Sequence, residues 1–94
     1  MNSPLDPAQL ELEVASLSGW VVDHDSLMKK FSFNSFRDAM AFMVRIGFEA
    51  EEKNHHPEML NVYNSVQIRL STHDAGGKIT AKDIELAKRI DAVK

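Results

Sequence analysis

Histidines and acidic residues gather in one window of this chain. Glu51 is followed by the adjacent pair His55 and His56, and His73 comes after the next apolar alternation. Histidine has an unperturbed pKa of ~6.5, so its imidazole can accept or release a proton near neutral pH. The set therefore predicts acid–base catalysis. Three histidines and a glutamate are also good zinc ligands, so a metal site is the competing interpretation.

The proline that follows the histidine pair bears on this choice. Pro57 disfavours helical geometry at His56, and successive extended residues point in opposite directions. We therefore predict that His55 and His56 diverge, with one entering a pocket and the other at its rim. Divergent side chains favour acid–base catalysis over a shared metal ion, so we expect no metal. His24 lies outside the pattern and is predicted to be a solvated turn residue.

Composition limits the class of protein. The 94 residues suit a single domain spanning 1–94. The chain has no cysteine, which excludes disulfides and thiolate zinc sites and leads us to expect a cytoplasmic location. Eleven Lys and Arg against fourteen Asp and Glu give a net charge of -3 without a basic stripe, so no nucleic-acid partner is expected. No apolar run approaches the ~18 residues of a membrane span.

Hydrophobic periodicity and capping residues predict three helices and two hairpins. The last helix opens with Thr80 and Asp83, and its Ile84, Ala87 and Ile90 are expected to face inward. The order α-β-β-α-β-β-α predicts an α+β fold, a four-stranded antiparallel sheet with the helices on one face. The expected segments are a helix over Pro7 to Leu17, strands at Trp20 to Val22 and Leu27 to Phe33, a helix from Ser35 to near Asn54, and strands at Leu60 to Tyr63 and Val66 to Thr72.

The central helix carries an apolar stripe that predicts its buried face or a subunit interface, made of Phe36, Met40, Met43, Val44, Gly47 and Phe48. Glu51 follows Met40 by eleven positions, which at ~100° per residue places the two roughly 20° apart on the helix. We therefore expect Glu51 to face inward and to orient His55 by a hydrogen bond. Its neighbour Glu52 should face water.

Three further residues have open roles. Asp83 can cap the last helix, or it can join a pocket with His73, which is predicted to end a strand. Trp20 can line the pocket or belong to the core. Lys29 shares a strand face with apolar residues, so we expect an edge position with its stem over apolar surface and its amine in water.

The motif residues as a set resemble the pterin-4a-carbinolamine dehydratases. The resemblance spans about residue 10 to the C-terminal end. It departs from the family at Met59 and Leu60, where many members carry two aromatics, and at Ala75, where animal relatives carry cysteine. It rests on Glu51-x-x-x-His55-His56-Pro57 with Tyr63, His73 and Asp83, supported by Gly19-Trp20, Phe31-x-Phe33, Asn61-Val62-Tyr63-Asn64 and Leu70-Ser71-Thr72-His73.

The resemblance implies a homotetramer that converts 4a-hydroxytetrahydropterin to quinonoid dihydropterin without a cofactor. This reaction follows aromatic amino-acid hydroxylation, so a hydroxylase is the implied pathway partner. The implied catalytic residues are His55, His73 and Glu51, and the implied substrate-binding residues are His56, Pro57, Trp20 and Asp83. Animal members also pair with a homeodomain transcription factor through the central helix. A dimerisation or coactivator module is therefore the alternative, although an intact histidine set favours the enzyme.

Overall fold

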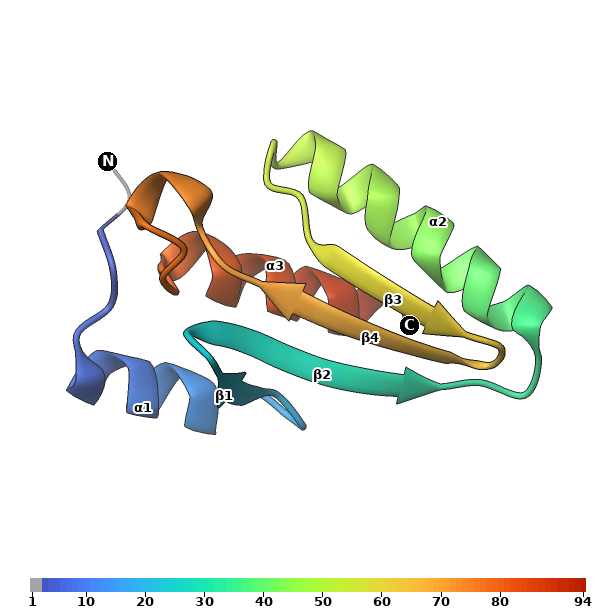
Figure 1. The fold of residues 1–94 in the computed structure, drawn as a ribbon, viewed down its shortest axis with the longest axis horizontal. Coiled ribbons are helices and arrows are strands. Elements are labelled where there is room, and N and C mark those ends of the chain that lie inside the picture. The colour runs from blue at the N-terminus through green and yellow to red at the C-terminus, as the bar shows by residue number, and fades with distance from the viewer. Residues whose placement is uncertain (1–2) are drawn as a thin grey trace.

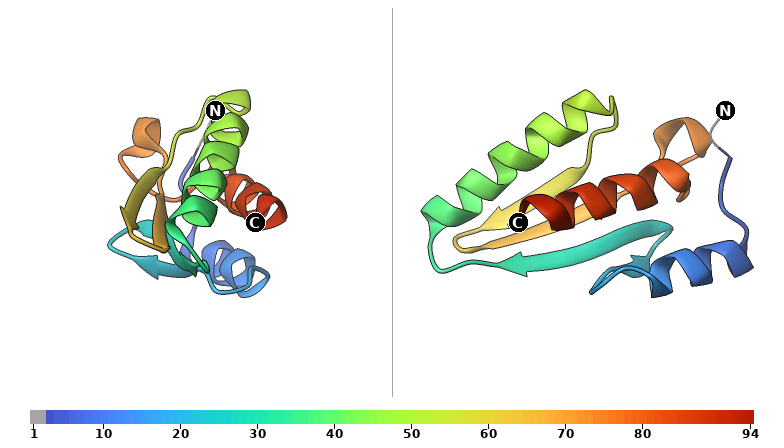
Figure 2. Two further views of the ribbon diagram at one scale, coloured as in Figure 1. Left: turned by 90° about the vertical axis from the view of Figure 1, so that its right-hand side faces the viewer. Right: turned by 180° about the vertical axis from the view of Figure 1, so that it is seen from behind.

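The computed structural model describes residues 3–94 and confirms the predicted order of elements and the α+β class. The four strands form one antiparallel sheet in the order β1-β2-β4-β3. The three α-helices lie on one face of this sheet, as the two views in Figure 2 make clear (Figures 1 and 2). The elements are α1 (Pro7–Ala15), β1 (Val21–Asp23), β2 (Ser26–Ser32), α2 (Phe36–Glu52), β3 (Glu58–Val62), β4 (Ser65–Leu70), the short 3-10 helix η1 (His73–Ala75) and α3 (Ala81–Val93).

Strand β4 holds the centre of the sheet. It pairs with β2 along one edge and with β3 along the other. Val66, Ile68 and Leu70 are buried, whereas the residues between them are half-exposed, as the period of two predicts. Two neighbours therefore fix the end of β4, from which the chain continues to Thr72 and His73.

Helix α1 packs against the core through the partly buried residues Leu10 and Val14. Asp6 caps it by accepting a backbone N–H at 2.8 Å, as predicted, but the helix ends at Ala15, two positions short of the predicted Leu17. The backbone N–H of Leu5 donates to the carbonyl of Ile79 at 3.0 Å. None of the residues of α1 is fully buried.

Helix α2 carries two apolar stripes, and the predicted one is not the buried one. The buried stripe consists of Ala39, Phe42, Ile46 and Ala50, whereas Phe36, Met40, Val44 and Phe48 are exposed. Of the predicted stripe, only Met43 packs against the core. Periodicity gives the spacing of a face but not its direction, and here the alanine-containing stripe allows α2 to approach the sheet closely. No helix within residues 3–94, α2 included, combines the length and apolar composition needed to cross a bilayer.

Lys29 also departs from its predicted environment. Strand β2 is an inner strand, and Lys29 pairs with Ile68 of β4. Its amine lies 2.8 Å from Asp91 of α3 and donates to the carbonyl of Ser18 at 2.6 Å. It also lies 4.8 Å from the ring centre of Phe31. The expected amine in water was wrong because α3 brings a carboxylate to this face of the sheet.

Charged residues join α2 to α3 in what we call the α2–α3 ion bridge. Arg89 of α3 lies 2.5 Å from Glu49 and 3.5 Å from Glu52, and Lys53 lies 2.8 Å from Glu85. The hydrogen bond from Lys53 holds the pKa of Glu85 below its usual value, and the bond to Glu49 raises the pKa of Arg89. Glu52 is exposed, as predicted. The bridge fixes the C-terminal end of α2 against α3.

Candidate active site

The chain turns sharply where α2 ends. Asn54 adopts a left-handed conformation with φ of 50°, which asparagine tolerates better than most residues. The N–H of His55 still donates to the carbonyl of Ala50, at 3.0 Å. Strand β3 then begins at Glu58, directly after Pro57. The two histidines therefore lie in a short irregular link between a rigid helix and a rigid strand.

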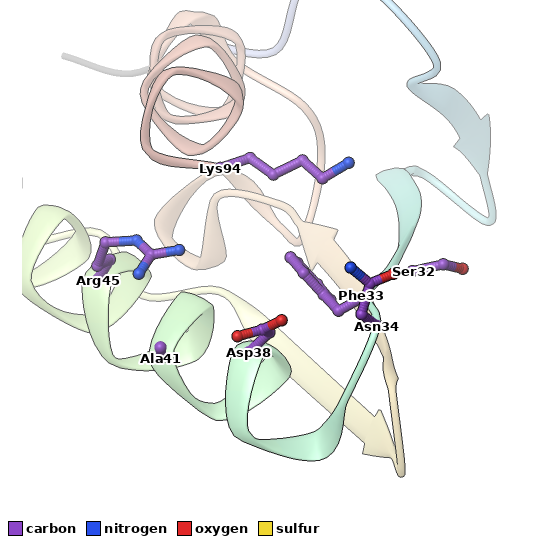
Figure 3. Close-up of a pocket in the computed structure, with 7 residues that line it drawn as sticks. All are labelled: Ser32, Phe33, Asn34, Asp38, Ala41, Arg45 and Lys94. Carbon is purple, nitrogen blue, oxygen red and sulfur yellow. The ribbon is translucent and has the colours of Figure 1, made fainter.

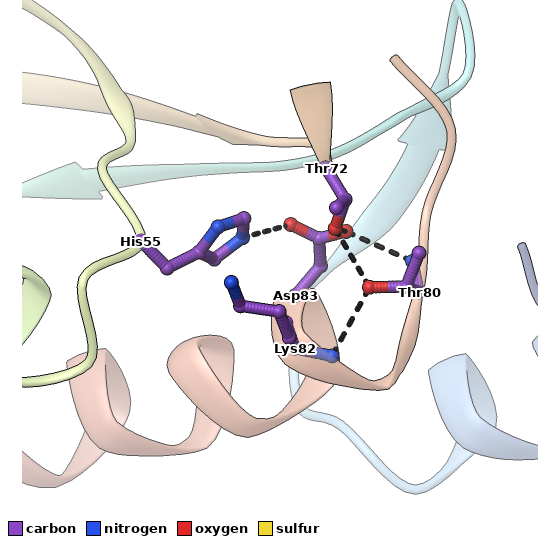
Figure 4. Close-up of polar contacts among 5 residues, drawn as sticks. All are labelled: His55, Thr72, Thr80, Lys82 and Asp83. Atoms are coloured by element: carbon purple, nitrogen blue, oxygen red, sulfur yellow. Dashed lines mark hydrogen bonds and ion pairs between the residues drawn. The ribbon is translucent and has the colours of Figure 1, made fainter. Parts of the chain in front are cut away.

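His55 points into the protein and meets a buried carboxylate. It is 7% exposed, and its Nε2 lies 2.5 Å from Oδ1 of Asp83, which is fully buried (Figure 4). An ionised carboxylate only accepts hydrogen bonds, so neutral His55 donates its Nε2–H and leaves Nδ1 unprotonated. Among residues 3–94, no hydrogen bond engages that Nδ1. His55 is thus prepared to accept a proton at Nδ1 and to return it.

Asp83 caps α3, which is one of the two roles that the sequence left open, and it also contacts His55. Its Oδ2 accepts the backbone N–H of Thr80 at 2.9 Å, which completes a capping box at the start of α3. The same oxygen accepts the hydroxyl of Thr72 at 2.8 Å. A buried carboxylate is costly unless it is well supplied with partners, and here three groups support it.

Two threonine hydroxyls order this network. Thr72 uses its single O–H on Asp83, so the hydroxyl of Thr80 must donate to Oγ1 of Thr72, 2.6 Å away. Oγ1 of Thr80 in turn accepts the backbone N–H of Lys82 at 3.2 Å. The carboxylate is held from the end of β4 and from α3 together (Figure 4). These partners fix the position of the Asp83 carboxylate, and the carboxylate in turn orients the His55 ring.

His56 points the other way and pairs with Glu51. The two side chains lie 2.8 Å apart and are 60% and 78% exposed. The predicted divergence of His55 and His56 is confirmed. The predicted contact between Glu51 and His55 was wrong. Glu51 lies near Met40 on the helical wheel as calculated, but that face of α2 is the exposed one.

The three histidines share one small cavity of about 220 Å³. His73 does not end β4 but opens η1, and it is exposed. The cavity joins the link after α2 to the link after β4, two segments far apart in sequence. Its lining residues are Asn54, His55, His56, Thr72, His73, Asp74 and Lys82. Sequence reasoning missed Asn54, Thr72, Asp74 and Lys82 as site residues, and their only signal was adjacency to the predicted residues His55, His73 and Asp83.

Four predicted site residues do not line this cavity: Glu51, Asp83, Trp20 and Pro57. Glu51 and Asp83 each contact one of its histidines. Trp20 is 3% exposed and donates its indole N–H to Asp91 at 3.0 Å. Asp91 lies about two helical turns along α3 from Asp83, so Trp20 belongs to the core. Pro57 is half-buried and adjoins His56 in sequence, but it does not line the cavity.

A larger cavity, of about 310 Å³, lies at the other end of α2 (Figure 3). It contains Asp38, Arg45 and Lys94, and Arg45 donates to the carbonyl of Val93 at 2.9 Å. It holds no group that titrates near neutral pH, so it is poorly suited to proton transfer. Within residues 3–94, no three His, Cys, Asp or Glu side chains converge as metal ligands do. The histidine cavity is therefore the candidate active site.

Comparisons with known proteins point to one family. A family model described as pterin 4 alpha carbinolamine dehydratase matches residues 3–93. The chain is 53% identical to a protein of Opitutus terrae, over 99% of this chain and 96% of that protein, and 47% identical to one of Sinorhizobium medicae, over 93% and 84%. Both carry the name "Putative pterin-4-alpha-carbinolamine dehydratase".

Solved structures extend this similarity to the fold. A crystal structure of a transcriptional coactivator/pterin dehydratase from Brucella melitensis matches with a TM-score of 0.90 and 33% identity, over 96% of this chain and 97% of that one. A pterin dehydratase-like protein identified as a RuBisCO assembly factor in the alpha-carboxysome matches with a TM-score of 0.64 and 25% identity, over 79% and 84%.

Proposed function

The chain belongs to the pterin-4a-carbinolamine dehydratase family, and we propose that it dehydrates 4a-hydroxytetrahydropterin to quinonoid dihydropterin by histidine acid–base catalysis. The observation that carries the proposal is the cavity shared by His55, His56 and His73, with His55 anchored on buried Asp83. In the reaction the hydroxyl leaves the 4a carbon as water after receiving a proton. A base removes a ring N–H proton, and the electron pair of that bond completes a carbon–nitrogen double bond. No electrons are gained or lost.

Each step needs a group that transfers a proton near neutral pH. A positioned side chain of this kind typically contributes ~10²- to 10⁴-fold in rate. His55 and His73 reach the cavity from separate links. The 4a carbon is a stereocentre, so each epimer would present its hydroxyl to a different imidazole. His56 would hold the polar edge of the ring, and Glu51 would act through His56 as a positioning residue.

The test is single-turnover dehydration of each separated epimer, followed by loss of the carbinolamine absorbance. We expect His55→Ala and His73→Ala each to retain part of the activity, with opposite preference between epimers. The double variant should fall close to the uncatalysed rate, because groups that substitute for each other are strongly non-additive. The two-sided assignment fails if one single variant abolishes turnover of both epimers while the other changes neither.

Treatment with a chelator distinguishes acid–base catalysis from a metal-ion mechanism. If the histidines transfer protons without a metal, activity should survive treatment with a strong chelator and should not rise on addition of zinc. Loss of activity in chelator and recovery with zinc would replace the acid–base mechanism with metal catalysis.

We further propose that the protein acts as a cytoplasmic homotetramer in tetrahydropterin recycling, after aromatic amino-acid hydroxylation. The exposed stripe of α2 supports the assembly. Phe36, Met40, Val44 and Phe48 are spaced by four residues and are between 43% and 72% exposed. Such a stripe marks an interaction surface. Sedimentation at micromolar concentration should give about four times the 10.6 kDa chain mass, and a monomer would contradict the proposal.

The same stripe supports the alternative function, a binding module. One structural relative is named a transcriptional coactivator as well as a dehydratase, and another is an assembly factor. A binding module would depend on the α2 stripe and not on the histidines. Wild-type protein that leaves the carbinolamine lifetime unchanged would favour this alternative over the enzyme.

A further inference from the structure

The histidine cavity contains a cation that the acid–base mechanism does not use. Lys82 lies in the first turn of α3, is half-buried and lines the cavity. Its side chain extends to the His55 side of Asp83 (Figure 4). The lysines that form ion pairs within residues 3–94 are Lys29, Lys53 and Lys78. Among these residues the ammonium of Lys82 has no carboxylate partner, so it is available to a ligand.

The same cavity also contains a carboxylate without an ion-pair partner among residues 3–94. Asp74 lines it, is exposed, and takes part in none of the ion pairs among residues 3–94. One free cation and one free anion leave the cavity close to charge balance. An anionic ligand would gain from Lys82 but would be repelled by Asp74. A neutral ring that offers both an acceptor and donors along one edge suits the two groups together.

We propose that Lys82 recognises the ring carbonyl oxygen of the pterin and so selects an oxo-bearing ring over an amino-bearing one. This assignment rests on the proposed function. The carbonyl carbon is bonded directly to the carbon that loses its hydroxyl. A donor beside His55 can therefore reach the carbonyl while the imidazole acts on the neighbouring centre. Lysine has three donors and no acceptor, so it binds a carbonyl oxygen and repels an amino group at the same place.

The size of the effect follows from the charge of the donor. Hydrogen bonds to charged groups are stronger than neutral ones, and removing the lysine should weaken binding of an oxo ligand about tenfold or more. An interaction made equally with substrate and transition state changes KM more than kcat. Lys82 should therefore act on affinity and ligand choice, whereas His55 and His73 act on turnover.

The experiment is a titration of two probes, pterin and 2,4-diaminopteridine, which carries an amino group in place of the carbonyl. The variants are Lys82→Met, which keeps the apolar stem, and Lys82→Arg, which keeps the cation. Lys88→Met is the matched control, because Lys88 is exposed on α3 and does not line the cavity. Thermal melting of each variant verifies that it is folded.

We expect wild type, Lys82→Arg and Lys88→Met to prefer pterin. Lys82→Met should bind pterin about tenfold more weakly and bind 2,4-diaminopteridine as wild type does or better. An equal loss for both probes, or unchanged pterin affinity, would overturn the assignment. If wild type binds neither probe and does not dehydrate the carbinolamine, the proposed function fails and the Lys82 assignment with it. If wild type binds pterin and Lys82→Met keeps the full preference, only the Lys82 assignment fails.

Discussion

The adjacent histidines after α2 each pair with a carboxylate, and the two pairs differ in burial and in sequence separation. His55 and Asp83 are 2.5 Å apart with side chains 8% and 0% exposed. His56 and Glu51 are 2.8 Å apart with side chains 60% and 78% exposed. The first pair joins residues 28 positions apart, and the second joins residues five positions apart. Burial and sequence separation, not residue type, distinguish the two pairs.

The energetics of the two pairs should differ accordingly. An exposed ion pair typically contributes ~0–1 kcal/mol, because water screens the charges and two side chains must be ordered. Removing one partner of a buried pair costs about 3–5 kcal/mol, because the other partner stays buried and unpaired. The His55–Asp83 pair is therefore expected to stabilise the fold, in addition to the catalytic role proposed for His55. The His56–Glu51 pair lies on the surface and should contribute little to stability.

The largest expected effect comes from deleting the two carboxylates in turn. Asp83→Ala leaves His55, the Thr72 hydroxyl and the Thr80 N–H without their partner. We expect urea denaturation to show a loss of about 3–5 kcal/mol in the free energy of unfolding. Glu51→Ala should lose no more than about 1 kcal/mol. Similar losses from the two variants would remove the distinction between the pairs.

Isosteric replacements test the same contrast in catalysis. Asp83→Asn keeps the shape but replaces one acceptor oxygen with an amide donor, which disturbs the bonds from His55, Thr72 and Thr80, so turnover should fall by ~10²-fold or more. Glu51→Gln should mainly raise KM by a few-fold, because Glu51 contacts His56. Glu52→Gln is the control, since Glu52 contacts Arg89 and neither histidine. Equal kcat losses in the Asp83 and Glu51 variants would show that burial does not separate their roles.

A smaller effect should come from the support beneath the buried pair. Thr72→Val keeps the shape but removes the hydroxyl that donates to Asp83 and accepts from Thr80. Leaving such buried groups unsatisfied costs about 1–3 kcal/mol. Thr72→Ser keeps the hydroxyl and is the matched control. Denaturation of both variants, with turnover measured alongside, checks the expectation. A Val variant as stable and as active as the Ser variant would contradict a positioning role for Thr72.

Much of the local structure could be predicted from neighbouring residues. Pro57 predicted the divergence of the two histidines, and the alternation of Val66, Ile68 and Leu70 predicted β4. Caps were equally readable, because Asp6 and Thr80 lie within three residues of the N–H groups they accept. These features depend on contacts along a few residues of chain, and the sequence records such contacts directly.

Contacts between distant segments could not be predicted in the same way. The helical wheel placed Glu51 beside Met40 correctly, but it could not show which apolar stripe of α2 faces the sheet. The same wheel predicts Glu51 as the partner of His55, whereas the observed partner is Asp83, 28 positions away. No sequence pattern marks Lys82, and it reaches the cavity only because the tertiary fold brings the start of α3 to the two links. The errors therefore fall where tertiary packing decides.

The smallest expected effect concerns the Lys53–Glu85 pair of the α2–α3 ion bridge, which is partly exposed. The pKa of Glu85 is lowered in the folded protein by Lys53, so its contribution is complete above the unfolded pKa. That contribution is lost as the pH falls through the lowered folded pKa. The stability difference between wild type and Glu85→Gln should therefore shrink in acid, and also in high salt. Glu11→Gln, an exposed α1 residue, should show neither trend. A difference that stays constant with pH would contradict the bridge.

Helix α1 has a consequence for how the protein opens. It has no fully buried residue and packs on the core only through partly buried Leu10 and Val14, whereas β4 is paired along both edges. Amide hydrogens of α1 should therefore exchange with deuterated solvent through local detachment, at a small fraction of the global unfolding free energy. Those of Val66, Ile68 and Leu70 should exchange only when the whole domain unfolds. Exchange measured under native conditions should thus resolve two tiers, and the histidine cavity, built at the end of β4, should belong to the slower one.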